Sequence, residues 1–84
     1  MKIQKLEKEL KVVSRSFTFG SEYGNYYLVD NDGKNYFWYT ASETAYEEMK
    51  EETRVLCKFT ETSYYYIDNS VVYYEVKNVR FKVI

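Results

Sequence analysis

The chain has 84 residues, 45% of them hydrophobic, which is the size of one globular domain that can bury a core without help from a metal or a disulfide. It contains one cysteine and no histidine, which excludes an internal disulfide, a tetrahedral Cys/His metal site and nucleophiles of the Cys–His or Ser–His–Asp kind. Its net charge of −1 is far from the basic balance of proteins that wrap double-stranded DNA.

The N-terminal segment predicts extended structure without a targeting signal. Met1–Lys5 begins with positive charge but has no apolar stretch behind it, so no signal peptide is expected. No apolar run approaches the roughly 20 residues of a membrane helix, and we expect a cytoplasmic protein with no membrane contact. Ile3, Leu6 and Leu10 fall at helical spacing, so a helical turn is the alternative, but extended structure is favoured from about Leu6 onward.

The first strand is predicted over Lys11–Phe19, because its apolar residues recur at every second position. One side of this strand is formed by Val13, Arg15, Phe17 and Phe19, and the other by Val12, Ser14, Ser16 and Thr18. A loop is expected over residues 20–25, where Gly20 and Gly24 can take positive φ.

The second and third strands are predicted over residues 26–30 and 35–40, both rich in aromatic residues. Asp32 and Gly33 lie between them and favour a tight hairpin turn in which both central residues take positive φ. Asp30 and Asp32 are expected to bind backbone N–H groups of this turn rather than a metal or a substrate.

A short acidic helix is predicted within residues 41–50, where Ser42 is a favourable N-cap residue. Its glutamates are expected to be solvated. Two sets of residues could face the core at helical spacing: Ala41, Ala45 and Met49, or Tyr46 and Met49.

Two further strands complete the chain. In the fourth, over residues 53–60, Cys57 alternates with apolar neighbours and is expected to be a small buried side chain. Tyr64–Ile67 would extend this strand to a second turn at residues 68–70, and at least one of its three tyrosine rings would then be exposed. The fifth strand is predicted over residues 71–84. Its apolar side is formed by Val79, Phe81 and Val83.

The order of these elements is three strands, a short helix and two strands, in one domain over residues 1–84. This order predicts an all-β fold with one short helix, and most closely a five-stranded Greek-key barrel like the OB-fold. An SH3-like small barrel fits nearly as well, and an α+β sheet packed on one helix is the third alternative.

Two stretches resemble small OB-fold domains of phages and mobile elements. The first runs from Phe19 to Thr40 and combines a Tyr-Gly loop, a strand ending in aspartate, an acidic-Gly turn and a strand with a central tryptophan. The second consists of two tripeptides in the last two strands, Lys58-Phe59-Thr60 and Arg80-Phe81-Lys82.

The resemblance covers about residues 11–84 and rests on turn and core patterns. It implies ligand binding through the face of strands two and three and through the first and last inter-strand loops, without defining the ligand. The chain departs from those domains at Tyr64–Ser70, where they often carry a basic, glycine-bearing hairpin.

Exposed rings and nearby cations are the candidate binding groups. Trp38 is favoured as a core residue over a stacking residue, and alternation puts Phe37 and Tyr39 on the opposite side of its strand. The candidate nucleic-acid-binding residues are Tyr23, Tyr27, Lys34, Phe37, Tyr39, Lys58, Tyr65, Arg80 and Lys82.

No phosphate-binding glycine loop or nucleophile elbow is present in the sequence, so we expect neither an enzyme nor a cofactor. The first hypothesis is a binding module that stacks single-stranded nucleic acid on its rings, with Lys and Arg neutralising phosphate. The second is a protein-interaction or self-assembly domain, for example a homodimer, that uses the same exposed tyrosines. A folded domain with neither role is the third reading.

Overall fold

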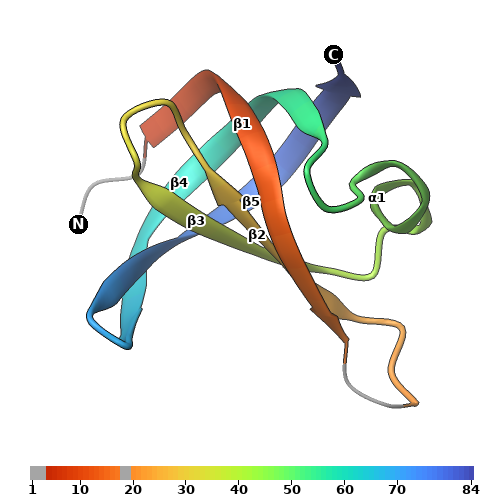
Figure 1. Ribbon diagram of the computed structural model, residues 1–84, viewed down its shortest axis with the longest axis horizontal. Coiled ribbons are helices and arrows are strands. Elements are labelled where there is room, and N and C mark those ends of the chain that lie inside the picture. Colours follow the sequence, from red (N-terminus) through yellow and green to blue (C-terminus); the bar gives the residue numbers. More distant parts are fainter. Residues whose placement is uncertain (1–3, 18–19) are drawn as a thin grey trace.

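Five strands and one short helix follow one another in the computed structural model, which describes residues 4–17 and 20–84 (Figure 1). The strands are β1 (Gln4–Phe17), β2 (Gly24–Val29), β3 (Asn35–Thr40), β4 (Arg54–Asp68) and β5 (Val71–Val83), and the helix α1 (Glu43–Glu48) lies between β3 and β4. The prediction of an all-β fold with one short helix is confirmed, and the helical alternative for the N-terminal segment is wrong, because β1 already begins at Gln4.

The strands close into a barrel in the order β1-β2-β3-β5-β4. Neighbouring strands are antiparallel except β3 and β5, which run parallel. The chain leaves β3 through α1 and crosses the barrel to β4, which pairs with β1 and so closes the wall. The result is the expected small five-stranded barrel, and its crossover is that of an OB-fold-like arrangement.

A β-bulge at Val13 changes which residues of β1 face the core. Val12 pairs with Leu28, but the next pair is Ser14 with Tyr27, so Val13 is the extra residue. Val12 is fully buried and Val13 is exposed, which contradicts the predicted apolar side at Val13. The bulge reverses the alternation, because one inserted residue moves every later side chain to the other face. Phe19 and Thr18 lie outside the described residues.

The turn between β2 and β3 differs from the predicted one, whereas the second predicted turn, at residues 68–70, is present between β4 and β5. Gly33 has φ of +84°, but Asp32 has no positive φ, so the expected two-residue turn with two left-handed residues is wrong here. Instead, Gly33 N–H donates to Asp30 C=O and Asp30 N–H donates to Lys34 C=O, which is a three-residue loop ending in a glycine bulge. The turn with two left-handed residues joins β4 to β5, where Asn69 and Ser70 have φ of +50° and +67°.

Helix α1 begins as predicted and packs one side on the barrel. The Ser42 hydroxyl accepts a hydrogen bond from Ala45 N–H, which satisfies a free donor of the first turn. Ala45 and Met49 are buried, whereas Ala41 and Tyr46 are exposed. The first predicted core set is therefore correct only for Ala45 and Met49. In the part of the chain that the structure describes, no helix has the length and apolarity to span a membrane.

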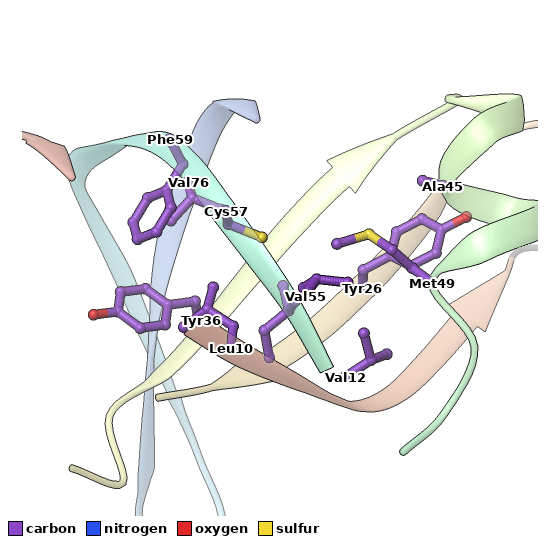
Figure 2. Packing of buried hydrophobic residues seen from close by; sticks show 11 residues of the cluster. Leu10, Val12, Tyr26, Tyr36, Ala45, Met49, Val55, Cys57, Phe59 and Val76 are labelled. Atoms are coloured by element: carbon purple, nitrogen blue, oxygen red, sulfur yellow. The ribbon is translucent and has the colours of Figure 1, made fainter. Parts of the chain in front are cut away.

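The core fills the barrel with side chains from every strand and from α1 (Figure 2). Val55, Cys57 and Phe59 of β4 point inward, as their alternation predicts. Trp38 packs against this core from β3 and lies 6.4 Å from the ring of Phe81, which supports its interpretation as a core residue.

Cys57 is expected to resist thiol reagents until the protein unfolds. Its side chain has no exposed surface, and burial raises the pKa of its thiol to about 12, so the reactive thiolate is both hidden and scarce near pH 8. Titration with a thiol-reactive dye should give no modification in buffer and one modified cysteine per chain in guanidinium chloride. Rapid stoichiometric labelling of the native protein would contradict this placement.

Candidate functional site

The outer side of the β2–β3 hairpin carries rings and amides. Alternation turns Tyr26, Leu28 and Tyr36 toward the core, because residues along a strand point to opposite faces. The outer positions form three cross-strand pairs: Asn25 with Tyr39, Tyr27 with Phe37, and Val29 with Asn35. None of these six side chains is charged.

A two-stranded arm formed by the far ends of β4 and β5 extends this ring surface. The arm projects from the barrel (Figure 1) and begins where Thr62, Ser63 and Tyr64 stand opposite a single residue of β5, Glu75. Thr62 Oγ1 donates to Glu75 Oε1 at 2.8 Å and accepts from Tyr64 N–H at 3.1 Å, which fixes this irregular start.

The arm packs its rings against the outer side of β2 and β3. The ring of Phe37 lies 4.9 Å from that of Tyr66 and 6.2 Å from that of Tyr64, and it is only 7% exposed although it is on the outside of the barrel. Tyr73 stacks on Tyr66 at 5.2 Å and meets the edge of Tyr27 at 5.4 Å. Tyr66 Oη donates to Tyr27 Oη at 3.3 Å.

We call this surface the aromatic face. It consists of Tyr23, Tyr27, Phe37, Tyr39, Tyr64, Tyr66 and Tyr73. Tyr23 and Tyr39 stack at 5.0 Å with 17° between their planes and remain 48% and 56% exposed. Burial, followed by the hydrogen bond with Tyr27, raises the pKa of Tyr66 and so further favours its neutral form. The aromatic face therefore offers ring planes and hydroxyls to a ligand.

The structure brings four of the nine candidate residues together and places the others elsewhere. Tyr23, Tyr27, Phe37 and Tyr39 belong to the aromatic face. Tyr65 is exposed on the other side of the arm, where its ring lies 6.1 Å from Tyr74. The cations are not among these rings.

Three candidate cations form a separate basic group on the β4–β5 wall. Lys58 pairs with Arg80 in the register, and Lys82 follows beside them. Lys58 Nζ lies 3.9 Å from Glu7 Oε2 at the solvent surface, which is a weak pair. Lys34 instead binds Glu61 Oε1 at 2.9 Å and lies over the ring of Tyr74.

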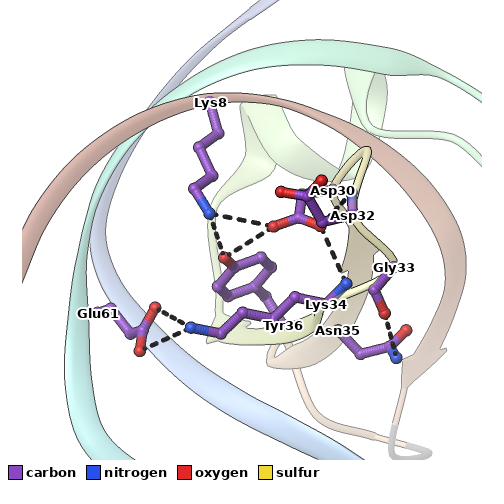
Figure 3. Close-up of polar contacts among 8 residues, drawn as sticks. All are labelled: Lys8, Asp30, Asp32, Gly33, Lys34, Asn35, Tyr36 and Glu61. Atoms are coloured by element: carbon purple, nitrogen blue, oxygen red, sulfur yellow. Dashed lines mark hydrogen bonds and ion pairs between the residues drawn. The ribbon is translucent and has the colours of Figure 1, made fainter.

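A buried polar network closes the end of the barrel at the β2–β3 turn (Figure 3). Asp30 Oδ1 accepts from the N–H groups of Asp32 and Lys34, both at 2.9 Å. Asp30 Oδ2 accepts from Lys8 Nζ at 3.0 Å and from Tyr36 Oη at 3.2 Å. The expected turn role is confirmed for Asp30, whose carboxylate is committed to structure by four bonds, but not for Asp32, whose exposed side chain accepts no backbone hydrogen bond from the described residues.

The electrostatics of this network follow from its contacts. Burial alone would raise the pKa of Asp30, but the Lys34 and Asp32 N–H groups and the Lys8 ammonium outweigh it, so the pKa lies below its ordinary value. The Tyr36 hydroxyl and then the Asp30 carboxylate raise the pKa of Lys8 against the opposing effect of burial. Within residues 4–17 and 20–84, no buried side-chain nitrogen or oxygen lacks a hydrogen-bond partner.

Sequence reasoning missed Tyr64, Tyr66 and Tyr73 as parts of the candidate site. The signal was the turn at Asn69 and Ser70, because a two-residue turn puts Tyr66 directly opposite Tyr73 and both on one side of the hairpin. Among the described residues, no group of three or more Cys, Asp or Glu side chains is placed to hold a metal ion. No protein-family model, curated protein or solved structure matches this chain.

Proposed function

We propose that this domain is a non-enzymatic binding module that holds single-stranded nucleic acid by stacking bases on the aromatic face. The observation that carries this proposal is the position of the rings. They cover the outer side of β2 and β3, which is the ligand side of OB-folds, and the β4–β5 arm extends them.

The exposed rings offer a stacking surface that is ready for a ligand. Tyr39 and Tyr23 already adopt the parallel arrangement that a base would continue, and neither ring is more than about half covered. Stacking of one base on one aromatic side chain contributes about 1–3 kcal/mol and tolerates any base, because every base has a flat ring.

Because of the charge distribution, stacking should contribute most of the binding free energy and phosphate contacts only a small part. The outer positions of β2 and β3 are uncharged, and the neighbouring positions of β5 add Glu75 and Lys77, which cancel. With Lys77 alone contacting phosphate, the affinity should fall with salt at a logarithmic slope of about −0.7, far shallower than for a basic binding groove.

Replacing Tyr39 with alanine is expected to weaken binding of an oligodeoxythymidylate of about 15 nucleotides by roughly 5- to 150-fold, the equivalent of 1–3 kcal/mol. Fluorescence anisotropy of the labelled oligonucleotide measures this loss. Tyr46→Ala is the matched control, because Tyr46 on α1 is equally exposed at 56% but lies outside the aromatic face. The control should bind like the parent protein.

Two results would overturn the proposal: no saturable binding at low salt, or an equal loss in Tyr39→Ala and Tyr46→Ala. The second candidate function is protein contact through the same face, which its lack of charge favours. In that case, sedimentation equilibrium without nucleic acid would show self-association that Tyr39→Ala abolishes, and added oligonucleotide would change nothing.

A further inference from the structure

Among the strands that the structure describes, the edge of β5 that faces away from β4 has a partner only near its beginning. β4 pairs with β5 along its whole length, whereas β3 pairs with it only at Tyr73, Tyr74 and Glu75. β3 then ends at Thr40, and among the described elements only β4 and β3 pack extensively along β5. The last part of β5, Val79–Val83, therefore presents an open edge in the barrel wall.

The direction of the backbone groups on this edge follows from one hydrogen bond. Ile84 N–H donates to Arg54 C=O at 3.0 Å, so Ile84 points its backbone groups toward β4. Alternate residues of a strand point their backbone groups to the same side. Lys82 therefore also bonds toward β4, and the N–H and C=O groups of Phe81 and Val83 point to the open edge.

Side chains beside the open edge leave apolar surface for an added strand. The rings of Trp38 on β3 and Phe81 on β5 meet edge to face, with 6.4 Å between their centroids, and both are only partly buried. Val83 is exposed at the end of the strand. In a strand added here, alternate side chains would point to opposite faces. One set would lie next to Phe81, and the other set would lie next to Arg80 and Lys82.

The charge of the edge selects the occupant. Lys77, Arg80 and Lys82 are all exposed on the outer side of β5. A second copy pairing its own β5 here would bring like charges together, which is how edge strands avoid self-association. A segment with acidic side chains on its outer side would instead meet three cations.

We propose that the open edge of β5 binds an extended acidic segment of another polypeptide as an added strand. Phe81 and Val83 supply the backbone hydrogen bonds, their partly exposed side chains contact the apolar side chains of the added segment, and Arg80 and Lys82 pair with its carboxylates. This site is separate from the aromatic face and does not depend on the nucleic-acid proposal.

Amide hydrogen exchange tests the premise and a peptide tests the binding. In the free protein, the amides of Phe81 and Val83 should exchange much faster than that of Lys82. An N-acetylated, C-amidated hexapeptide of alternating glutamate and valine should slow the exchange of these two amides and shift their NMR signals. The matched peptide with lysine in place of glutamate should have no effect.

Two variants complete the test. The double variant Arg80→Glu/Lys82→Glu should weaken binding of the acidic peptide by about tenfold, since each exposed ion pair contributes only modestly to the binding free energy. Val83→Pro removes an N–H donor at the open edge but no hydrogen bond to β4, and it should also weaken binding of the acidic peptide. Equal protection of Phe81, Val83 and Lys82 in the free protein would overturn the proposal, as would binding of both peptides alike. Displacement of the acidic peptide by oligodeoxythymidylate from this edge would assign the cations to nucleic acid instead.

Discussion

Replacing Asp30 with alanine is expected to lower the free energy of unfolding by about 3 kcal/mol. Removing one member of a buried ion pair typically costs about 3–5 kcal/mol, because the remaining charge is left without a partner. Here the lower end applies, since the Lys8 side chain is 32% exposed and can be rehydrated. The variant also loses the acceptor of two turn N–H groups. Urea denaturation followed by Trp38 fluorescence measures the difference.

Asp30→Asn separates the ion pair from the turn. The amide oxygen can still accept from Asp32 and Lys34 N–H, but the amide nitrogen cannot accept from Lys8 or Tyr36. We therefore expect Asp30→Asn to lower the free energy of unfolding by less than Asp30→Ala does. A loss below about 1 kcal/mol for Asp30→Ala would show that the network contributes no more than an exposed pair.

The stability advantage of the parent over Asp30→Asn should depend on pH in a defined direction. The pKa of Asp30 is lowered in the folded state, so its contribution is complete above the ordinary aspartate pKa and is lost as the pH falls through the folded value. The pKa of Lys8 is raised, so its contribution is lost only at strongly alkaline pH. The advantage should be flat from about pH 5 to 9 and shrink toward pH 3.

Replacing Phe37 with alanine is expected to release the β4–β5 arm from the barrel and to cost about 3 kcal/mol. Truncating a buried phenylalanine typically costs about 3–5 kcal/mol, and Phe37 is the ring on which Tyr64 and Tyr66 rest. The arm should lose amide protection before the barrel does, because a two-stranded hairpin is marginal without packing. Hydrogen exchange of the Tyr66 and Tyr73 amides, which bond to each other's strand across the arm, reports this directly.

Phe37→Leu is the control for this prediction, because it keeps most of the apolar volume under the arm. It should preserve arm protection and lose less stability. If Phe37→Ala destabilises the arm and the barrel equally, the arm is part of the global folding unit rather than a separately docked element. The same variant should also weaken oligonucleotide binding, since Tyr64 and Tyr66 would no longer be held in the aromatic face.

Local rules allowed much of the fold to be predicted. Period-two alternation put Tyr36 and Trp38 on one side of their strand and Phe37 and Tyr39 on the other, since successive side chains of a strand point to opposite faces, but it left open which side is buried. The helix start at Ser42 followed from the hydrogen-bond needs of the first turn. The same rules failed at Val13. A bulge is a property of the pairing between two strands, so the alternation within one strand's sequence does not reveal it.

The candidate site was predictable only in part. Rings on strands two and three could be named from the sequence, because neighbours in a hairpin are neighbours along the chain. The covering of Phe37 by Tyr66, the bond from Lys8 to Asp30 across 22 residues, and the separation of Lys58 and Arg80 from the rings could not.

The sequence by itself determined where the strands, the turns and the helix cap lie, since these depend on backbone geometry within a few residues. Only the tertiary structure decided which distant surfaces meet. The barrel closes through the short parallel pair of β3 and β5. This closure determines the position of the arm, the position of the cations on the β4–β5 wall, and the edge that stays open. These are consequences of packing one shared core, in which each strand's position depends on all the others.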